Sequence, residues 1–163
     1  MAETLTSSIF LMAMGVWLGG VVFFSFFTAP VIFERLPRNT AADLISVIFP
    51  RYYNLGYSCG GAMLVAGAFP IYLNITSINA WSSWSLALIA FMVSLYAGQV
   101  VMPRVRRLRL TAASSAGSPE HGKNREKYDR SHQWSITLNS MVLLLLIAQT
   151  LLYGYRVKSE FLG

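Results

Sequence analysis

Charge is what this sequence lacks most. Only 12 % of its 163 residues are charged, whereas 55 % are hydrophobic and the mean hydropathy is +0.50. A typical soluble domain carries about 25 % charged residues. An ionised side chain in hydrocarbon costs at least about 2.5–3.5 kcal/mol, so segments embedded in a membrane keep few of them. The shortage of charge therefore predicts a membrane protein, and the chain has the length of one domain.

Cysteine and histidine are also nearly absent. The single cysteine, Cys59, excludes a disulfide within the chain, and the only histidines are His121 and His132. A haem held by two histidines needs both at membrane depth, yet His121 falls in the stretch 111–124, which is rich in small and polar residues. The sequence has no nucleophile elbow, P-loop, dinucleotide fingerprint or zinc signature. It therefore predicts a non-enzymatic protein with no bound cofactor or metal.

Long apolar segments are what the chain has instead. Four of them are evident, at 7–33, 52–75, 80–102 and 134–155. The first would reach about 40 Å as a helix, which exceeds the roughly 30 Å hydrocarbon layer of a bilayer. Pro30 is expected to kink its last turns, because proline cannot donate a helical hydrogen bond. The predicted fold class is all-α, a single integral membrane domain built as a four-helix bundle.

The connections between these spans differ in length. A short turn covers 76–79, whereas 34–51 and 103–133 are long. In the first long connection, apolar residues at helical spacing from Leu44 to Phe49 follow a weak capping box and precede Pro50. This pattern predicts a short interfacial helix between the first two spans.

Small residues recur at four-residue spacing in three of the spans. The pairs are Gly15 and Gly19, Gly56 and Gly60, and Ser94 and Gly98. Small side chains let another backbone approach closely, which is how membrane helices gain packing energy. We therefore expect these pairs to pack helices together, and Gly19→Leu to loosen the bundle more than Leu18→Ala.

The basic residues that give the net charge of +6 lie beside the apolar segments. Three of them fall in 34–51 and eight in 103–133, against two near the C-terminus, Arg156 and Lys158. Because basic residues favour the cytoplasmic side, both long connections are expected in the cytoplasm and both termini outside it. The expected partner is the lipid bilayer rather than nucleic acid. A membrane-protein partner or a homo-oligomer stays open.

The most suggestive polar pattern begins the fourth span. His132, Ser135 and Asn139 are three and four residues apart, so they share one helical face. Lipid offers no hydrogen-bond partner, so this face is expected to meet protein or water. It could serve as a proton or cation relay or as a metal or haem ligand. Alternatively, it could be a hydrogen-bonding strip that fixes the register of the helix.

Further polar residues are expected to join this face at the inner end of the bundle. They are Glu34, Asn54, Gln99 and Arg130. Glu34 is the only carboxylate next to a span. It is expected to form an ion pair with Arg35, Arg38, Arg130 or an arginine of 104–109.

Soft metal ligands are a separate possibility. The residues concerned are Met12, Met14, Met63, Met92 and Cys59, which all fall within spans. Thioethers and thiolates suit Cu(I), but methionine also fills gaps in apolar cores, and none of these spacings is a metal motif.

Four blocks of the chain resemble, in the same order, the transmembrane-protein-205-like family. They are W-L-G-G-V-V-F-F-S-F-F-T-A-P-V-I-F at 17–33, F-P-R-Y-Y at 49–53, M-P-R-V-R-R at 102–107 and R-S-H-Q-W-S-I-T-L-N at 130–139. The resemblance implies a four-helix integral membrane protein whose bacterial members are mostly of unknown function, and it carries no catalytic residue set. We expect this chain in a bacterial inner membrane. The positions it carries over are Gly19, Pro30, Phe33, Arg51, Pro103, His132, Ser135 and Asn139.

Three functions stay open. The first is a non-enzymatic bundle or accessory subunit that acts through its glycine faces. The second is a small transporter or channel for a cation, metal or small solute, with a cytoplasmic-side polar cavity that Glu34, Gln99, His132 and Asn139 line. The third is a haem or copper redox protein. It rests on a more distant likeness to copper-resistance D-type and protoporphyrinogen-oxidase-type membrane proteins, which place histidines within their spans.

Overall fold

The computed structural model describes residues 2–72, 78–115 and 117–162, and every secondary-structure element within them is helical. The elements are α1 (Ala2–Val22), the π-helical η1 (Phe23–Thr28), α2 (Ala29–Arg35), α3 (Arg38–Tyr72), α4 (Ile78–Tyr96), the π-helical η2 (Ala97–Val101), α5 (Met102–Ser114) and α6 (His121–Leu162). The predicted all-α class is confirmed. Residues 73–75 of the predicted second span and residues 76 and 77 of the predicted turn lie outside the described residues.

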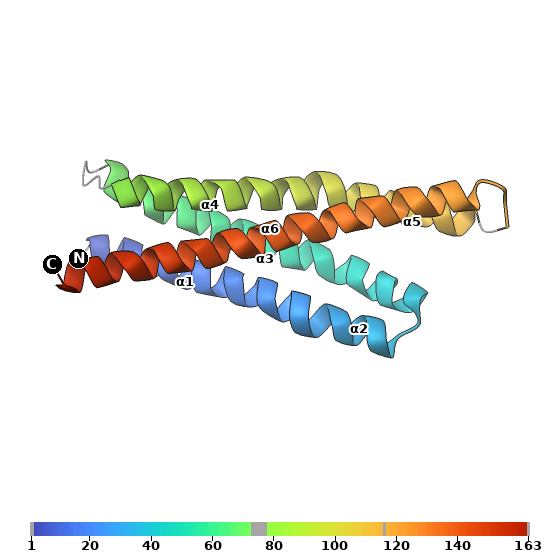
Figure 1. Ribbon diagram of the computed structural model, residues 1–163, viewed down its shortest axis with the longest axis horizontal. Coiled ribbons are helices and arrows are strands. Elements are labelled where there is room, and N and C mark those ends of the chain that lie inside the picture. Colours follow the sequence, from blue (N-terminus) through green and yellow to red (C-terminus); the bar gives the residue numbers. More distant parts are fainter. Residues whose placement is uncertain (1, 73–77, 116, 163) are drawn as a thin grey trace.

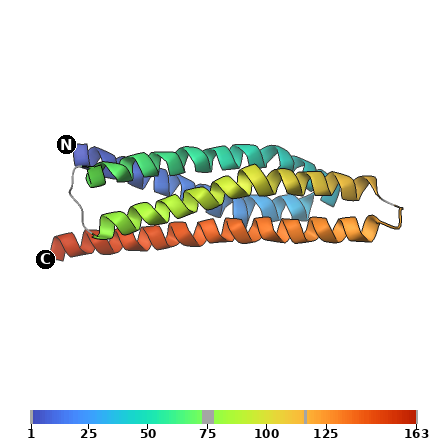
Figure 2. The ribbon, with the colours of Figure 1, turned by 90° about the horizontal axis from the view of Figure 1, so that it is seen from above.

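These elements form four long antiparallel rods: α1–η1–α2, α3, α4–η2–α5, and α6 (Figures 1 and 2). In chain order, α1 packs on α3, α3 on α4, and α4 and α5 on α6, while α6 also contacts α1 and closes the ring. Figure 1 shows both termini at one end and the α2–α3 and α5–α6 connections at the other.

Among the described residues, three of the rods are long and apolar enough to cross a membrane. They are Thr4–Arg35, Trp81–Ser114 and His121–Tyr155, which contain the first and fourth predicted spans and all of the third except Ala80. The second predicted span forms the C-terminal half of α3, as far as its residues are described. Large apolar side chains such as Met12, Val65 and Leu151 are at least 70 % exposed. Such an apolar exterior fits a membrane protein.

The predicted interfacial helix is not a separate element. Residues 40–49 are helical, but they are the first turns of α3, which continues through Pro50. Aromatic packing accounts for this continuity. Phe49 and Tyr52, on either side of the proline, both pack on Phe24 of η1, with ring centroids 5.3 and 4.9 Å apart. The same neighbour thus holds both sides of the helix in line.

The long connection expected at 103–133 is mostly helical. Because α5 runs on to Ser114 and α6 starts at His121, the polar stretch 111–124 shrinks to a tight turn. The N–H of Ser118 donates to the carbonyl of Ser115 at 2.9 Å, and that of His121 to Ser118 at 3.1 Å. Gly117 turns the chain with a φ of 87°, which glycine adopts without strain.

The first and third rods each widen into a π-helix just before a proline. In η1, the N–H of Ala29 bonds to the carbonyl of Phe24, five residues back, and η2 repeats this pattern before Pro103. Pro30 and Pro103 have no N–H, and their rings would clash with the carbonyl four residues back. The extra residue of the π-turn moves that carbonyl aside, so each proline marks a local widening of its helix.

Trp17 of α1 fills the centre of the bundle. It is 3 % exposed and lies against two glycines of α3. A Cβ at Gly56 would lie 3.0 Å from the indole Nε1, and one at Gly60 would lie 3.0 Å from Cζ3 and 2.5 Å from Phe91. The Gly56–Gly60 pair therefore receives aromatic rings.

Ser94 of α4 and Gly98 of η2 close the same interface. Ser94 is buried, and its Oγ would lie 3.3 Å from a Cβ at Gly56. A Cβ at Gly98 would lie 2.8 Å from Cγ of Tyr53 and would also clash with the hydroxyl of Tyr57. The α3–α4 interface thus depends on small side chains along its length.

Gly15 and Gly19 do not pack helices within this chain. Both are exposed, and a Cβ at either would meet no neighbouring heavy atom within 4 Å. The expectation of a close contact there inside the bundle is wrong. Trp17, which lies between these two glycines in sequence, turns inward instead. Gly15 and Gly19 therefore face outward.

Candidate functional site

A cavity of about 480 Å³ lies between η1–α2, α3 and the first half of α6. We call it the η1–α6 cavity. Its apolar walls include Phe24, Phe26, Phe33, Ile45, Phe49, Ile136 and Leu143. Its polar lining consists of Ser25, Tyr53, His132, Ser135, Asn139 and Ser140, and its described lining includes no Asp, Glu, Lys or Arg. Phe26, Phe33 and Ile136 are exposed, so the cavity opens sideways on the outer surface of the bundle.

A chain of hydrogen bonds includes two of these lining residues, Ser25 and Asn139. The hydroxyl of Tyr52 donates to Oδ1 of Asn139 at 2.5 Å, and Nδ2 of Asn139 donates to Oγ of Ser25 at 3.0 Å. Tyr53 also interacts with the side chain of Ser135, which is buried. Asn139 therefore ties α6 to both α3 and η1, which fixes the register of the three elements.

His132 differs from the two polar residues that follow it on its face. Its ring stacks on Tyr128 with centroids 5.8 Å apart and planes 11° apart. Within the described part of the chain, its nitrogens have no hydrogen-bond partner. Asp129, three residues before His132 on α6, pairs with Arg125 at 3.8 Å and acts on the imidazole only through its charge. The half-buried imidazole thus remains free to bond to a molecule in the cavity.

The predicted polar cluster divides in the structure. His132, Ser135 and Asn139 line the η1–α6 cavity, whereas Arg130 lies on the opposite side of α6 in a second groove. Glu34, Asn54 and Gln99 are exposed and line neither space. A single inner-side cavity that Glu34 and Gln99 share with the α6 residues is therefore not formed.

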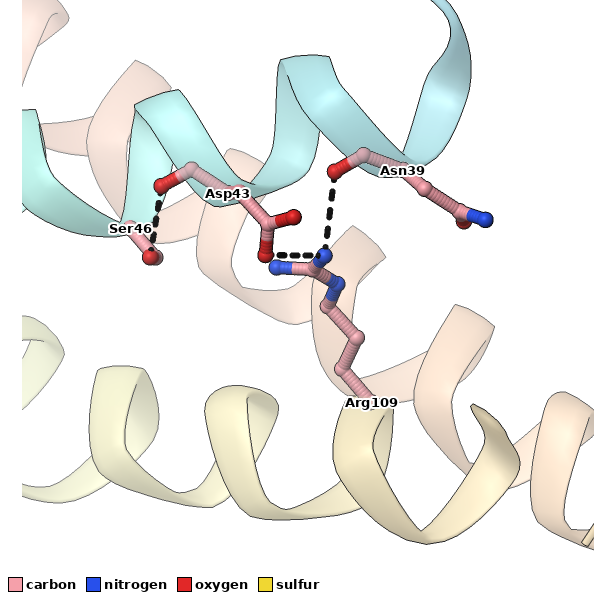
Figure 3. A network of polar contacts seen from close by, with 4 residues as sticks. All are labelled: Asn39, Asp43, Ser46 and Arg109. Carbon is pink, nitrogen blue, oxygen red and sulfur yellow. Dashed lines mark hydrogen bonds and ion pairs between the residues drawn. The ribbon is translucent and has the colours of Figure 1, made fainter. Parts of the chain in front are cut away.

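The expected ion pair of Glu34 is absent among the described residues. The arginine cluster reaches a different carboxylate, as Figure 3 shows: Arg109 of α5 donates to Asp43 at 2.7 Å and to the carbonyl of Asn39 at 3.1 Å. Arg130 pairs with Glu126, one turn away on α6, at 3.1 Å. Asp43 lies in the second turn of α3, within reach of α5, whereas Glu34 lies in the last turn of α2 and is exposed.

The candidate soft-metal ligands also divide. Met14, Met63 and Cys59 are buried in one apolar core, and Met12 and Met92 are exposed on the outer surface. No three His, Cys, Asp or Glu side chains in residues 2–72, 78–115 and 117–162 lie close enough to hold one metal ion.

The two histidines cannot face each other across one haem. His121 and His132 lie on the same helix, about 16 Å apart along its axis at 1.5 Å per residue. The Nδ1 of His121 also lies 3.1 Å from the carbonyl of Ala112, so this ring belongs to the α5–α6 turn. The donor set thus does not fit a bis-histidine haem.

Three residues of the site were missed by the sequence analysis. Tyr52 and Tyr53 look like residues of an aromatic belt at the membrane boundary, but both turn into the bundle. Ser25 interrupts the run F-F-S-F-F, and that isolated polar residue in an apolar helix was the one signal available. That signal is weak, because a serine in an apolar helix can also bond to its own helix backbone.

Comparisons with known proteins give one family and one relative. The family described as a domain of unknown function, DUF4149, matches residues 12–114, from α1 to the end of α5. A protein of Aquifex aeolicus (strain VF5), described as an uncharacterized protein, is 26 % identical over 140 residues, which cover 86 % of this chain and 90 % of the relative. No solved structure matches. The resemblance to the transmembrane-protein-205-like family is not confirmed by these comparisons and stays a prediction.

Proposed function

The chain belongs to the DUF4149 family, and from the geometry of its η1–α6 cavity we propose that it is a non-enzymatic membrane protein that binds a neutral, lipid-soluble molecule. The observation that carries the proposal is the combination of aromatic walls, uncharged polar groups and a sideways opening. A cation would need carboxylates, and an anion would need Lys or Arg, to replace their hydration. The cavity lining supplies neither.

The polar groups indicate what such a molecule would carry. Ser25, Ser135 and Asn139 are engaged with one another or with tyrosines, so the free imidazole of His132 and the hydroxyl of Ser140 are the groups left for a ligand. A hydroxyl or carbonyl group would bond there while the apolar part packs on Phe26, in a cavity of ordinary ligand size. If the protein is a transporter, the uncharged lining favours a neutral solute over a cation or a metal ion.

Photolabelling tests this proposal. A neutral diazirine lipid with one hydroxyl group, incorporated with the protein in phosphatidylcholine nanodiscs, should label 24–33 and 132–143 preferentially. Ala29→Trp places a large side chain in the cavity and should abolish that preference. Gly19→Trp is the matched control on the same rod, because Gly19 faces open space, and it should leave the labelling unchanged. Even labelling of all outward-facing helices in the unmodified protein would contradict the proposal.

For the membrane topology, we propose four spans in a bacterial inner membrane with both termini outside the cytoplasm. The common location of the termini and the eleven basic residues of the two long connections support this orientation. A reporter enzyme active only outside the cytoplasm should work when fused after Gly163 and be silent when inserted at Ser115. The reverse pattern would invert the topology.

A second candidate, an accessory or self-associating subunit, is favoured by the open glycines of α1. Gly15 and Gly19 are exposed beside Met12, Val16 and Phe23, so another membrane helix could approach there. Chemical crosslinking in nanodiscs at one chain per disc and at several should separate the two candidates. Association that Gly19→Leu disrupts would favour the subunit, and an unassociated protein with a labelled cavity would favour the binding protein.

A further inference from the structure

A second space, of about 530 Å³, lies on the other side of α6, between it and the η2–α5 segment. We call it the α5–α6 groove. Four cationic side chains line it, Arg104, Lys123, Lys127 and Arg130, together with one carboxylate, Glu126. All five are exposed. The groove therefore collects an excess of three positive charges on one face of the bundle.

Most of this charge is not neutralised by the protein. Glu126 is engaged by Arg130 at 3.1 Å, whereas Arg104, Lys123 and Lys127 have no ion pair or side-chain hydrogen bond to any residue that the structure describes. Two neighbouring arginines are paired within the protein. Arg109 is paired with Asp43 at 2.7 Å (Figure 3), and Arg125 with Asp129. Arg106 and Arg107 of α5 are also exposed, but they lie outside the groove, so the groove is where three unpaired cations share one lined space.

The groove changes from apolar to cationic along its length. Tyr96 and Val100 lie on successive helical turns and are about half exposed. Arg104 lies one turn further, toward the α5–α6 turn. The antiparallel α6 repeats the order, with Trp134 followed toward the α5–α6 turn by Arg130 and Lys127. One end therefore suits hydrocarbon and the other suits negatively charged oxygen atoms.

We propose that the α5–α6 groove is a binding site for an anionic phospholipid. Its phosphate would bond to Arg104 and Lys127, with Lys123 near the rest of the headgroup, and its acyl chains would run along Val100 and Trp134. Basic pockets between membrane helices at the cytoplasmic side have the charge to hold such headgroups. The site is independent of the η1–α6 cavity, because α6 separates the two.

Native mass spectrometry from mixed micelles of phosphatidylcholine and phosphatidylglycerol tests this proposal. The unmodified protein should retain phosphatidylglycerol in preference to phosphatidylcholine. The double variant Arg104→Gln, Lys127→Gln should lower the retention of phosphatidylglycerol by roughly tenfold or more. The matched control is Arg106→Gln, Arg107→Gln, which removes two exposed arginines of the same helix outside the groove and should change retention by no more than about twofold.

The other outcomes are equally informative. An equal loss in both double variants would mean general attraction of the basic surface to anionic lipid, which overturns a specific site. Displacement of phosphatidylglycerol by millimolar inorganic phosphate would assign the groove to the free anion, and this also overturns the proposal. Equal thermal unfolding of both variants in phosphatidylcholine alone shows that each is folded. Should the groove variant not fold, two measurements replace it. Lower retention of phosphatidylglycerol by Lys123→Gln would support the proposal, and equal retention of both lipids by the unmodified protein would overturn it.

Discussion

The α3–α4 interface and the η1–α6 interface join apolar helices of one bundle, yet the first is closed and the second holds a cavity. In the first, Gly56, Gly60 and Gly98 leave room that aromatic rings fill to contact distance. In the second, a π-turn ahead of Pro30 widens the helix, and the polar side chain of Asn139 bridges the gap.

The difference shows two ways of joining helices without a hydrophobic driving force between them. Close packing gains dispersion energy at every contact and leaves no room for a ligand. Hydrogen bonds such as Tyr52 to Asn139 act over a wider separation and hold their helices in register while space remains between them. We therefore expect substitutions at the closed interface to act on stability, and those at the open one to act chiefly on binding.

The largest effect is expected at Gly60. The variant Gly60→Leu forces a side chain into Phe91 and Trp17, so it should lower the free energy of unfolding by about 3 kcal/mol or more. Gly61→Leu is the matched control, because a Cβ at Gly61 meets no neighbouring atom within 4 Å. Thermal unfolding in detergent measures both. Similar losses for the two variants would show that the loss does not come from crowding at the closed interface, because leucine favours a helix more than glycine does at both positions.

The contrast between Gly60 and Gly19 also shows where sequence reasoning stopped. The long apolar runs correctly predicted helices and an all-α fold, because hydrocarbon demands internal backbone hydrogen bonds. The same G-x-x-x-G spacing, however, lies inside the bundle at 56–60 and outside it at 15–19. A helix that is apolar all round has no polar face to reveal which side turns inward. Only the packing of Trp17 decides.

The candidate site was predictable only in part, because the sequence leaves the rotation of the apolar helices open. His132, Ser135 and Asn139 stand out by their helical spacing, and the structure places all three on one cavity. Their partners came from elements whose rotation the sequence leaves open, so Tyr52 and Ser25 did not stand out. The continuity of α3 through Pro50 was also missed, because local proline chemistry argues for a stop and distant aromatic contacts override it.

An intermediate effect is expected at the open interface. Asn139→Leu leaves the Tyr52 hydroxyl and Ser25 without their partner and should cost about 1–2 kcal/mol. Tyr52→Phe should cost less. In a double-mutant cycle, the two changes should be coupled by about 0.6–1.7 kcal/mol, the range for hydrogen bonds between membrane helices. Strict additivity of the two losses would mean that this bond does not hold α6 to α3. Photolabelling of the cavity in the same variants then reports whether lost register also weakens binding.

The smallest effect is expected at Gly19, and it reverses the order that the glycine spacing predicts. Gly19 is exposed with open space above it, so Gly19→Leu should change the free energy of unfolding by less than about 0.5 kcal/mol. Leu18 is partly buried against the core around Trp17, so Leu18→Ala should cost about 1 kcal/mol or more. Thermal unfolding at one chain per nanodisc measures both without interference from self-association. A larger loss for Gly19→Leu there would place a close helix contact at α1, and the distinction between closed and open interfaces would then fail for that helix.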